Sequence, residues 1–268
     1  GVFLFAPAAA LAEGNQVNQA RGPSGGGIQT NQVKGIFTVS GGFLSYESTN
    51  SSADDSNPVV AGNASALVHF SDAWTAQADL LAEQVVLDDD VNDYLYAQHQ
   101  GVAVHVMRRF GSGQVGVFAG FGQGTAAYDE FFSGGWYGIE GQLWFDNITV
   151  GGQLAVLDIG DHWGDDDGLV TDAYMLRGTG RYFFTNDVMA QIDLTSVQGD
   201  DWQGNNTDSF EAFEWELSLK ARVADAPIYA GIAYRDGQYE DNYDNDNADI
   251  GELTVSLTFL FGSTSLRD

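Results

Sequence analysis

The residues best placed to do chemistry are charged side chains that recur at alternate positions of otherwise apolar stretches. Arg177 and Arg181 lie in one such stretch, and Lys220 lies in another. Fixed charges that line a channel set which ions it prefers. We therefore take the following alternate positions as candidate pore-lining residues: Asp79, Glu83, Glu140, Arg177, Arg181, Asp193, Glu214, Glu216, Lys220, Arg222 and Glu252.

These candidates divide into a basic and an acidic group. The basic side chains come from neighbouring stretches and have Asp193 between them, whereas Asp79, Glu83 and Glu140 come from stretches farther along the chain. Opposed basic and acidic walls would create a transverse field along which polar solutes align. Alternatively, the same residues close the interior with salt bridges and serve stability alone. The sequence does not predict ion selectivity, because acidic loops favour cations and a basic wall favours anions.

Catalytic and metal chemistry find less support in the sequence. His69 and Ser71 form the only close His–Ser pair, and they fall at an expected tight turn. We expect His105 near His69, but two histidines without a third ligand make a poor metal site. The glycines of 116–122 follow a strand pattern with no helix after it, which disfavours a nucleotide-binding loop. We therefore expect no enzyme, no cofactor and no metal.

The charged positions belong to a unit that repeats along the chain. In residues 74–83 one face carries only apolar side chains: Trp74, Ala76, Ala78, Leu80 and Ala82. Successive side chains of a strand point to opposite faces, so each stretch has one apolar and one mostly polar side. The pattern recurs through 136–156, 173–195, 213–235 and 252–261, and less regularly near 33–46, 94–107 and 114–124. It predicts an all-β fold of about twelve strands, an even number as in single-chain bacterial barrels.

The connections between these stretches alternate in length. Short turns are expected near 71–72, 108–113, 146–147, 185–187 and 224–227. Long loops are expected near 47–58, 85–93, 125–134, 158–170, 198–209 and 236–249. Short periplasmic turns and longer outer loops are typical of a closed, up-and-down transmembrane barrel.

Aromatic residues of the apolar faces gather at both ends of the expected strands. Those expected near the outer rim are Tyr94, Tyr96, Phe121, Tyr137, Tyr174, Phe213, Trp215 and Tyr234. Those expected near the periplasmic rim are Phe70, Trp74, Phe145, Tyr182, Phe259 and Phe261. Two aromatic girdles around an aliphatic belt suit a bilayer, because amphipathic rings prefer the headgroup level.

Composition agrees with an exported, non-nucleic-acid-binding protein. The chain has no cysteine, which disfavours a disulfide framework or a thiolate metal site. Its net charge of −28, from 38 acidic and 10 basic residues, would repel nucleic acid. Most acids fall in the long loops, as in Asp88–Asp90 and Asp165–Asp167. Such loops could collect divalent cations, but their spacing does not match a calcium-binding loop.

The two ends of the chain differ from the repeating part. Residues 1–12 resemble the apolar end of a secretory signal peptide, with Ala10 and Ala12 fitting the cleavage pattern. Residues 13–32 are polar and are interpreted as a flexible leader. No later stretch is apolar enough for a spanning helix, so we expect membrane insertion through strands. The barrel is expected over 33–261, followed by a C-terminal tail over 262–268.

Residues 33–261 resemble the bacterial outer-membrane β-barrel superfamily, porin-like in the broad sense. The resemblance rests on the hairpin alternation, the loop asymmetry and the final strand that ends in Leu257–Phe261. It implies an outer-membrane location and contact with outer-membrane lipid and lipopolysaccharide. It also implies recognition by the outer-membrane assembly machinery, and homo-oligomers are common among such barrels.

The function expected first is a passive channel for small polar solutes or ions. A structural or adhesive barrel that acts through its acidic surface loops is the second candidate, and an outer-membrane enzyme is a distant third. An autotransporter translocator is disfavoured, because the signal-peptide remnant leads almost directly into the first strand.

Overall fold

The computed structural model describes most of the expected barrel. The described residues are 33–48, 51–87, 95–125, 131–161, 170–201, 209–223, 225–241, 246–263 and 265–266. The expected signal-peptide remnant, the polar leader and the acidic runs at 88–90 and 165–167 lie outside them. No helix among the described residues is long and apolar enough to span a bilayer.

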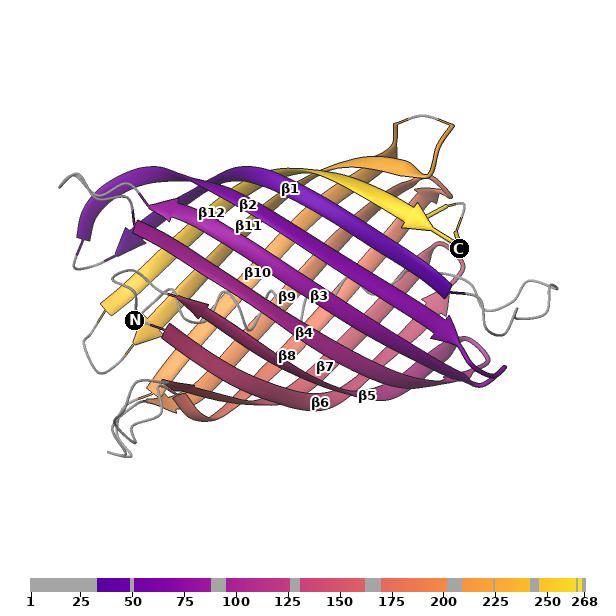
Figure 1. The fold of residues 1–268 in the computed structure, drawn as a ribbon, viewed down its shortest axis with the longest axis horizontal. Helices are drawn as coiled ribbons and strands as arrows, with labels where there is room; N and C mark the ends of the chain where they lie inside the picture. Colours follow the sequence, from indigo (N-terminus) through magenta and orange to yellow (C-terminus); the bar gives the residue numbers. More distant parts are fainter. Residues whose placement is uncertain are drawn as a thin grey trace.

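Twelve strands account for nearly all of the described chain (Figure 1). They are β1 (Val33–Ser48), β2 (Ser51–His69), β3 (Trp74–Leu87), β4 (Leu95–Phe110), β5 (Gly113–Thr125), β6 (Phe131–Phe145), β7 (Ile148–Asp161), β8 (Val170–Thr185), β9 (Val188–Asp201), β10 (Ser209–Arg222), β11 (Ile228–Asp241) and β12 (Asp246–Phe261). The strand number and the antiparallel all-β fold confirm the prediction.

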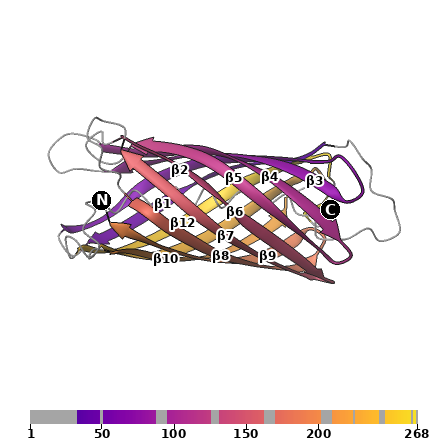
Figure 2. The same ribbon diagram turned by 90° about the horizontal axis from the view of Figure 1, so that it is seen from below.

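The strands form one closed barrel in which each pairs with its two sequence neighbours, and β1 pairs with β12. The closing ladder is antiparallel and runs from Gly35 opposite Phe261 to Ser48 opposite Ala248. Figures 1 and 2 show the tilted strands wrapping around the long axis. Closure removes free sheet edges, so backbone N–H and C=O groups are paired without water, as hydrocarbon requires.

Side chains alternate between the two faces of the wall as the sequence predicts. On β4, Val104 is 55% exposed on the outside, whereas His105 is 3% exposed on the inside. Exposed aromatics mark both rims, among them Tyr137 and Phe213 at one and Trp74 and Phe145 at the other. The two expected girdles are thereby present, although Tyr94 and the side chain of Tyr96 lie outside the described residues.

Short turns join the strands at one end of the barrel, which we call the periplasmic end. Residues 111–112, 146–147 and 186–187 form two-residue connections. Gly111 and Asp146 adopt positive φ of 30° and 40°, as tight hairpin turns require. The short connections at 70–73 and 223–227 lie at the same end.

At the opposite, outer end the strands reach farther than expected. The expected loop at 47–58 narrows to 49–50, and the expected loop at 236–249 narrows to 242–245. These two loops were expected to be longer because the polarity of the two strand faces inverts near this end, which makes the strand ends resemble loops. Leu157 and Ile250 face inward and are buried, whereas the following Asp158 and the preceding Asp249 are exposed on the outside.

This inversion is what a barrel needs once it rises above the bilayer. Beyond the outer aromatic girdle the wall faces water, so polar residues point outward and apolar residues fill the inside, as in a soluble barrel. The outward glutamines of this section, Gln84, Gln98, Gln100 and Gln123, follow the same rule. The outer part of the inner face is therefore apolar, which corrects the expectation of a polar inner face throughout.

A charge scan on β4 tests which part of the outer surface meets lipid. Val104→Arg places a charge near mid-membrane and should cost about 2–4 kcal/mol of folding free energy in vesicles, whereas Gln98→Arg should cost about 0–1 kcal/mol. Both side chains are exposed on the outer face, so the pair is matched. Urea titration in lipid vesicles measures the difference. Equal costs at the two positions would mean that Val104 does not face hydrocarbon.

Candidate functional site: the barrel interior

The inward-facing side chains form three tiers along the barrel axis. Apolar residues cluster at the periplasmic end, ionisable and amide side chains occupy the middle, and a second apolar group lies at the outer end. All eleven candidate residues are on strands with their side chains on the inner face, but Arg222 lies at the periplasmic rim rather than in the middle tier. Whether they line a pore stays a prediction.

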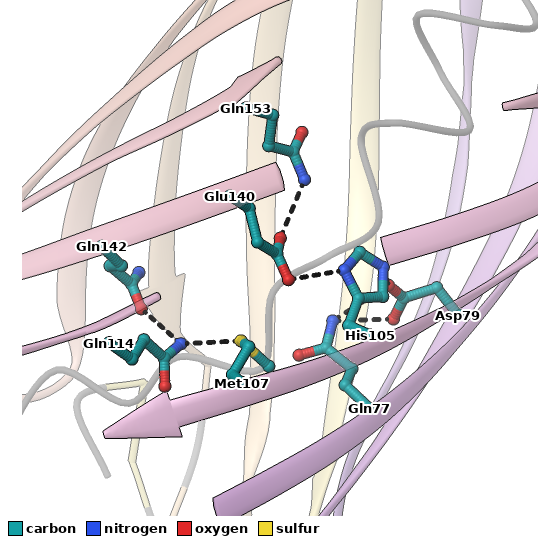
Figure 3. Close-up of polar contacts among 8 residues, drawn as sticks. All are labelled: Gln77, Asp79, His105, Met107, Gln114, Glu140, Gln142 and Gln153. Carbon is teal, nitrogen blue, oxygen red and sulfur yellow. Dashed lines mark hydrogen bonds and ion pairs between the residues drawn. The ribbon is translucent and has the colours of Figure 1, made fainter. Parts of the chain in front are cut away.

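His105 is the centre of the first polar network of the middle tier (Figure 3). Its Nδ1 lies 2.9 Å from Glu140 Oε1, and its Nε2 lies 2.9 Å from Asp79 Oδ2 in ion-pair contact. The amide of Gln77 donates to both Asp79 oxygens at 2.9 Å, and that of Gln153 donates to Glu140 Oε2 at 3.1 Å. One ring thereby joins two buried carboxylates, each held by a glutamine.

The chain brings Glu140 to His105 across an intervening strand. On β5 the residue opposite Glu140 is Gly116, which leaves no side chain in the way. A methyl group at Gly116 would overlap Met107 and the backbone of β4. Phe118, opposite His105 on β5, stacks on the imidazole with ring centroids 5.4 Å apart. Gly116 and Phe118 on β5 thus allow the contact between His105 on β4 and Glu140 on β6.

A second network surrounds Asp193 on the β8–β9 wall. Arg177 Nη2 lies 2.6 Å from Asp193 Oδ1, and Thr179 Oγ1 donates to the same oxygen at 2.6 Å. The Gln191 amide donates to the other oxygen, and Arg181 Nε donates to Gln191 Oε1 at 2.7 Å. The expectation that Asp193 lies among the basic side chains is confirmed. Its carboxylate offsets the charge of Arg177, so this wall is less cationic than its composition suggests.

A third network crosses the interior. Arg235 on β11 forms an ion pair with Glu252 on β12, and its Nη2 also lies 3.9 Å from Glu83 Oε1 on β3. Glu83 in turn lies 3.8 Å from His99 Nε2 on β4. Strands β12, β1 and β2 separate β11 from β3 around the wall, so the contact joins separate parts of the wall through the interior. Glu216 is also opposite Arg235 in the ladder.

Sequence reasoning missed Arg235, although the signal was present. It directly follows Tyr234, whose outward placement was expected, so alternation alone would have turned Arg235 inward. His105 was considered only as a neighbour of His69, and the structure gives the two different partners. His69 is the last residue of β2, and its Nδ1 lies 2.9 Å from Thr75 Oγ1 on the next strand of the same hairpin. Ser71 Oγ accepts backbone hydrogen bonds of that turn, which is the role of a turn cap.

Three other candidates lie at the edges of the middle tier. Tyr239 OH donates to Glu214 Oε1 and so connects the middle tier to the outer apolar group. Arg222 pairs with Asp187 at 2.7 Å at the periplasmic rim, where both are partly exposed. Lys220 faces inward between these two levels.

The periplasmic tier includes a returning segment after β12. Gly262 has φ +68°, and a Cβ there would overlap the backbone of Val33. The Ser263 hydroxyl donates to the Ser265 carbonyl at 2.9 Å, and Leu266 is 2% exposed. Leu266 packs with inward residues from widely spaced strands: Ile36, Leu67, Phe183, Met189, Tyr229 and Leu260. The expected C-terminal tail therefore turns back to fill the periplasmic mouth.

The outer apolar tier is a collar to which every strand contributes. Its residues are Leu44, Val59, Val85, Ala103, Phe118, Trp136, Ala155, Leu157, Ala173, Met175, Val197, Ala212, Tyr239, Ala248 and Ile250. The indole of Trp136 lies over Gly120 on β5, where a methyl group would overlap it. Its Nε1 is buried and has no hydrogen-bond partner within the part of the chain that the structure describes. A solute between the outer end and the middle tier would have to pass this apolar ring.

Loss of His105 should destabilise the barrel more than loss of His69. His105→Ala leaves the Asp79 and Glu140 carboxylates buried without their shared cation, which costs about 3–5 kcal/mol. His69→Ala removes one hydrogen bond and should cost about 1 kcal/mol. Urea unfolding of both variants in the same detergent measures the difference. A His105 variant as stable as the His69 variant would show that the two carboxylates do not depend on the ring.

Comparison with known proteins gives a fold without a family. No protein-family model matches the sequence, and no curated protein sequence matches it significantly. Among solved structures, an outer membrane channel from Pseudomonas putida F1 is similar with a TM-score of 0.53 and 10% identity, over 90% of this chain and 100% of that chain. The CymD monoaromatic hydrocarbon channel is similar with a TM-score of 0.51 and 7% identity, over 87% of this chain and 89% of that chain.

These identities show the fold alone. The fold is that of bacterial outer-membrane β-barrels. Together with the apolar outward surface bounded by aromatic girdles, it places the chain in the bacterial outer membrane.

Proposed function

We propose that this protein is an outer-membrane channel through which small polar solutes or ions diffuse passively. The proposal rests on one observation, the charge imbalance of the middle tier. Seven carboxylates face the interior there, against four basic side chains and His105: Asp79, Glu83, Glu140, Asp193, Glu214, Glu216 and Glu252 against Arg177, Arg181, Lys220 and Arg235.

A purely structural plug of salt bridges would need matched charges. Burying an unmatched carboxylate away from water is costly, so excess carboxyl groups either bind protons or have water or mobile cations beside them. Around Arg235 the imbalance is local, because Glu83 and Glu252 both contact this one guanidinium. An interior that holds water and exchangeable cations is the property that a channel requires.

The fold supports the same proposal. Both of the solved structures named above are channels, so this barrel architecture is one that channels use. Among the described residues, the close pair of His69 and Ser71 does not support catalysis, because Ser71 caps its turn through its hydroxyl. We therefore propose no enzymatic activity. Homo-oligomerisation and recognition by the assembly machinery remain predictions from the resemblance.

Single-channel recording on purified, refolded protein tests the proposal. We expect discrete current steps in KCl that are absent with heat-denatured protein. We also expect a reversal potential in a salt gradient that shows preference for cations, because carboxylates outnumber bases in the middle tier. A folded barrel that passes no current in any salt, yet binds cells or lipopolysaccharide, would reject the channel and favour the structural or adhesive alternative.

We expect the segment that returns after β12 to narrow the path at the periplasmic end. Leu266→Ala shortens the side chain that packs among inward residues at that end, so single-channel conductance should rise. Leu143→Ala is the matched control, because Leu143 points outward near the same end. Its conductance should equal that of the parent protein. If Leu266→Ala also leaves conductance unchanged, the segment does not limit the path.

A further inference from the structure

Two adjoining tiers of the interior differ sharply in chemistry. The collar is a cluster of buried apolar and aromatic side chains to which every strand contributes, among them Phe118, Trp136 and Tyr239. Directly beneath it the middle tier carries excess carboxylates. On β10 the collar residue Ala212 lies just outside Glu214, whereas on β4 His99 lies nearer the outer end than the collar residue Ala103, so the two tiers interlock on that side.

The two tiers join at Tyr239 and Glu214. The phenol hydroxyl of Tyr239 donates to the Glu214 carboxylate, so an aromatic ring and an anionic group adjoin. Gly237 lies beside both side chains, and a methyl group there would lie 2.9 Å from Glu214 Cγ and 3.3 Å from Tyr239 Cε2. Glycine at this position therefore allows the Glu214 and Tyr239 side chains to approach each other. An aromatic face beside a carboxylate is the combination that attracts an ammonium group.

The collar itself disfavours small hydrated ions. An apolar constriction excludes ions that cannot shed their water, whereas a solute with an apolar body loses less by entering it. The collar also holds a second polar group, Trp136 Nε1, which is buried and has no hydrogen-bond partner among the described residues. Such a donor is suited to a passing solute that carries a hydrogen-bond acceptor or a π-face.

From these features, and resting on the proposed channel function, we infer that the preferred solutes are organic cations in which an ammonium group is attached to an aromatic or aliphatic body. The body crosses the collar by contact with its apolar side chains. The ammonium group is drawn to the junction of Tyr239 and Glu214 and from there to the carboxylates around Arg235. Exposed acids on the outside of the outer section, among them Asp158 and Asp249, attract cations from solution.

Bi-ionic recordings with benzylammonium chloride on one side and potassium chloride on the other test this inference. We expect benzylammonium to be at least as permeant as K⁺ despite its larger size. Benzoate has a size similar to that of benzylammonium but the opposite charge, and we expect it to carry little current when sodium benzoate is used. Glu214→Gln should lower the permeability ratio of benzylammonium to K⁺ by about two- to fivefold. Glu47→Gln, which removes an exposed outward charge at the outer rim, should leave the ratio unchanged.

The outcomes separate this inference from the proposed function. A K⁺ current with benzylammonium excluded would overturn the inference and leave the channel standing. Equal passage of benzylammonium and benzoate would likewise overturn it, because charge would then not select. If Glu214→Gln retains the K⁺ current and leaves the permeability ratio of benzylammonium to K⁺ unchanged, the junction of Tyr239 and Glu214 does not contact the permeating solute. Absence of current with every salt would reject the channel itself.

Discussion

The structure depends on the need of every backbone N–H and C=O group to have a partner where no water is available. Twelve antiparallel strands meet this need only because β1 returns to pair with β12. Closure in turn divides the chain into two surfaces, since alternate side chains must face either lipid or the enclosed interior. The apolar outside, the charged middle tier and the aromatic rims all follow from that division.

The same constraint explains why the interior changes character along the axis. Within the membrane the apolar residues are needed outside, so ionisable groups gather inside and pair, as Arg177 does with Asp193. Above the membrane the outside is wet, and the alternation inverts to give an apolar collar. Near the periplasmic end Leu266 adds a further apolar contact. The charged tier thus lies between two apolar ones, and its excess of carboxylates gives the interior its electrostatic character.

Much of this was predictable from alternation, because a period of two is a local property of the chain. It correctly oriented Leu80 and placed Asp193 among basic side chains. It failed at 47–58 and 236–249, where inverted polarity resembled loop composition. The contacts of His105 with Glu140 and of Arg235 with Glu83 were beyond reach. They join strands that are not sequence neighbours and depend on barrel closure, curvature and the missing side chain at Gly116.

The outward face of the wall meets lipid, and the inward face does not. Tryptophan fluorescence in vesicles of brominated phosphatidylcholine tests it, with variants that each retain a single tryptophan. Trp74 and Trp215 point outward, and Trp136 and Trp144 point inward and are buried. We expect strong quenching of Trp74 and Trp215 and little quenching of Trp136 and Trp144. Quenching of Trp136 or Trp144 as strong as that of Trp74 would contradict it.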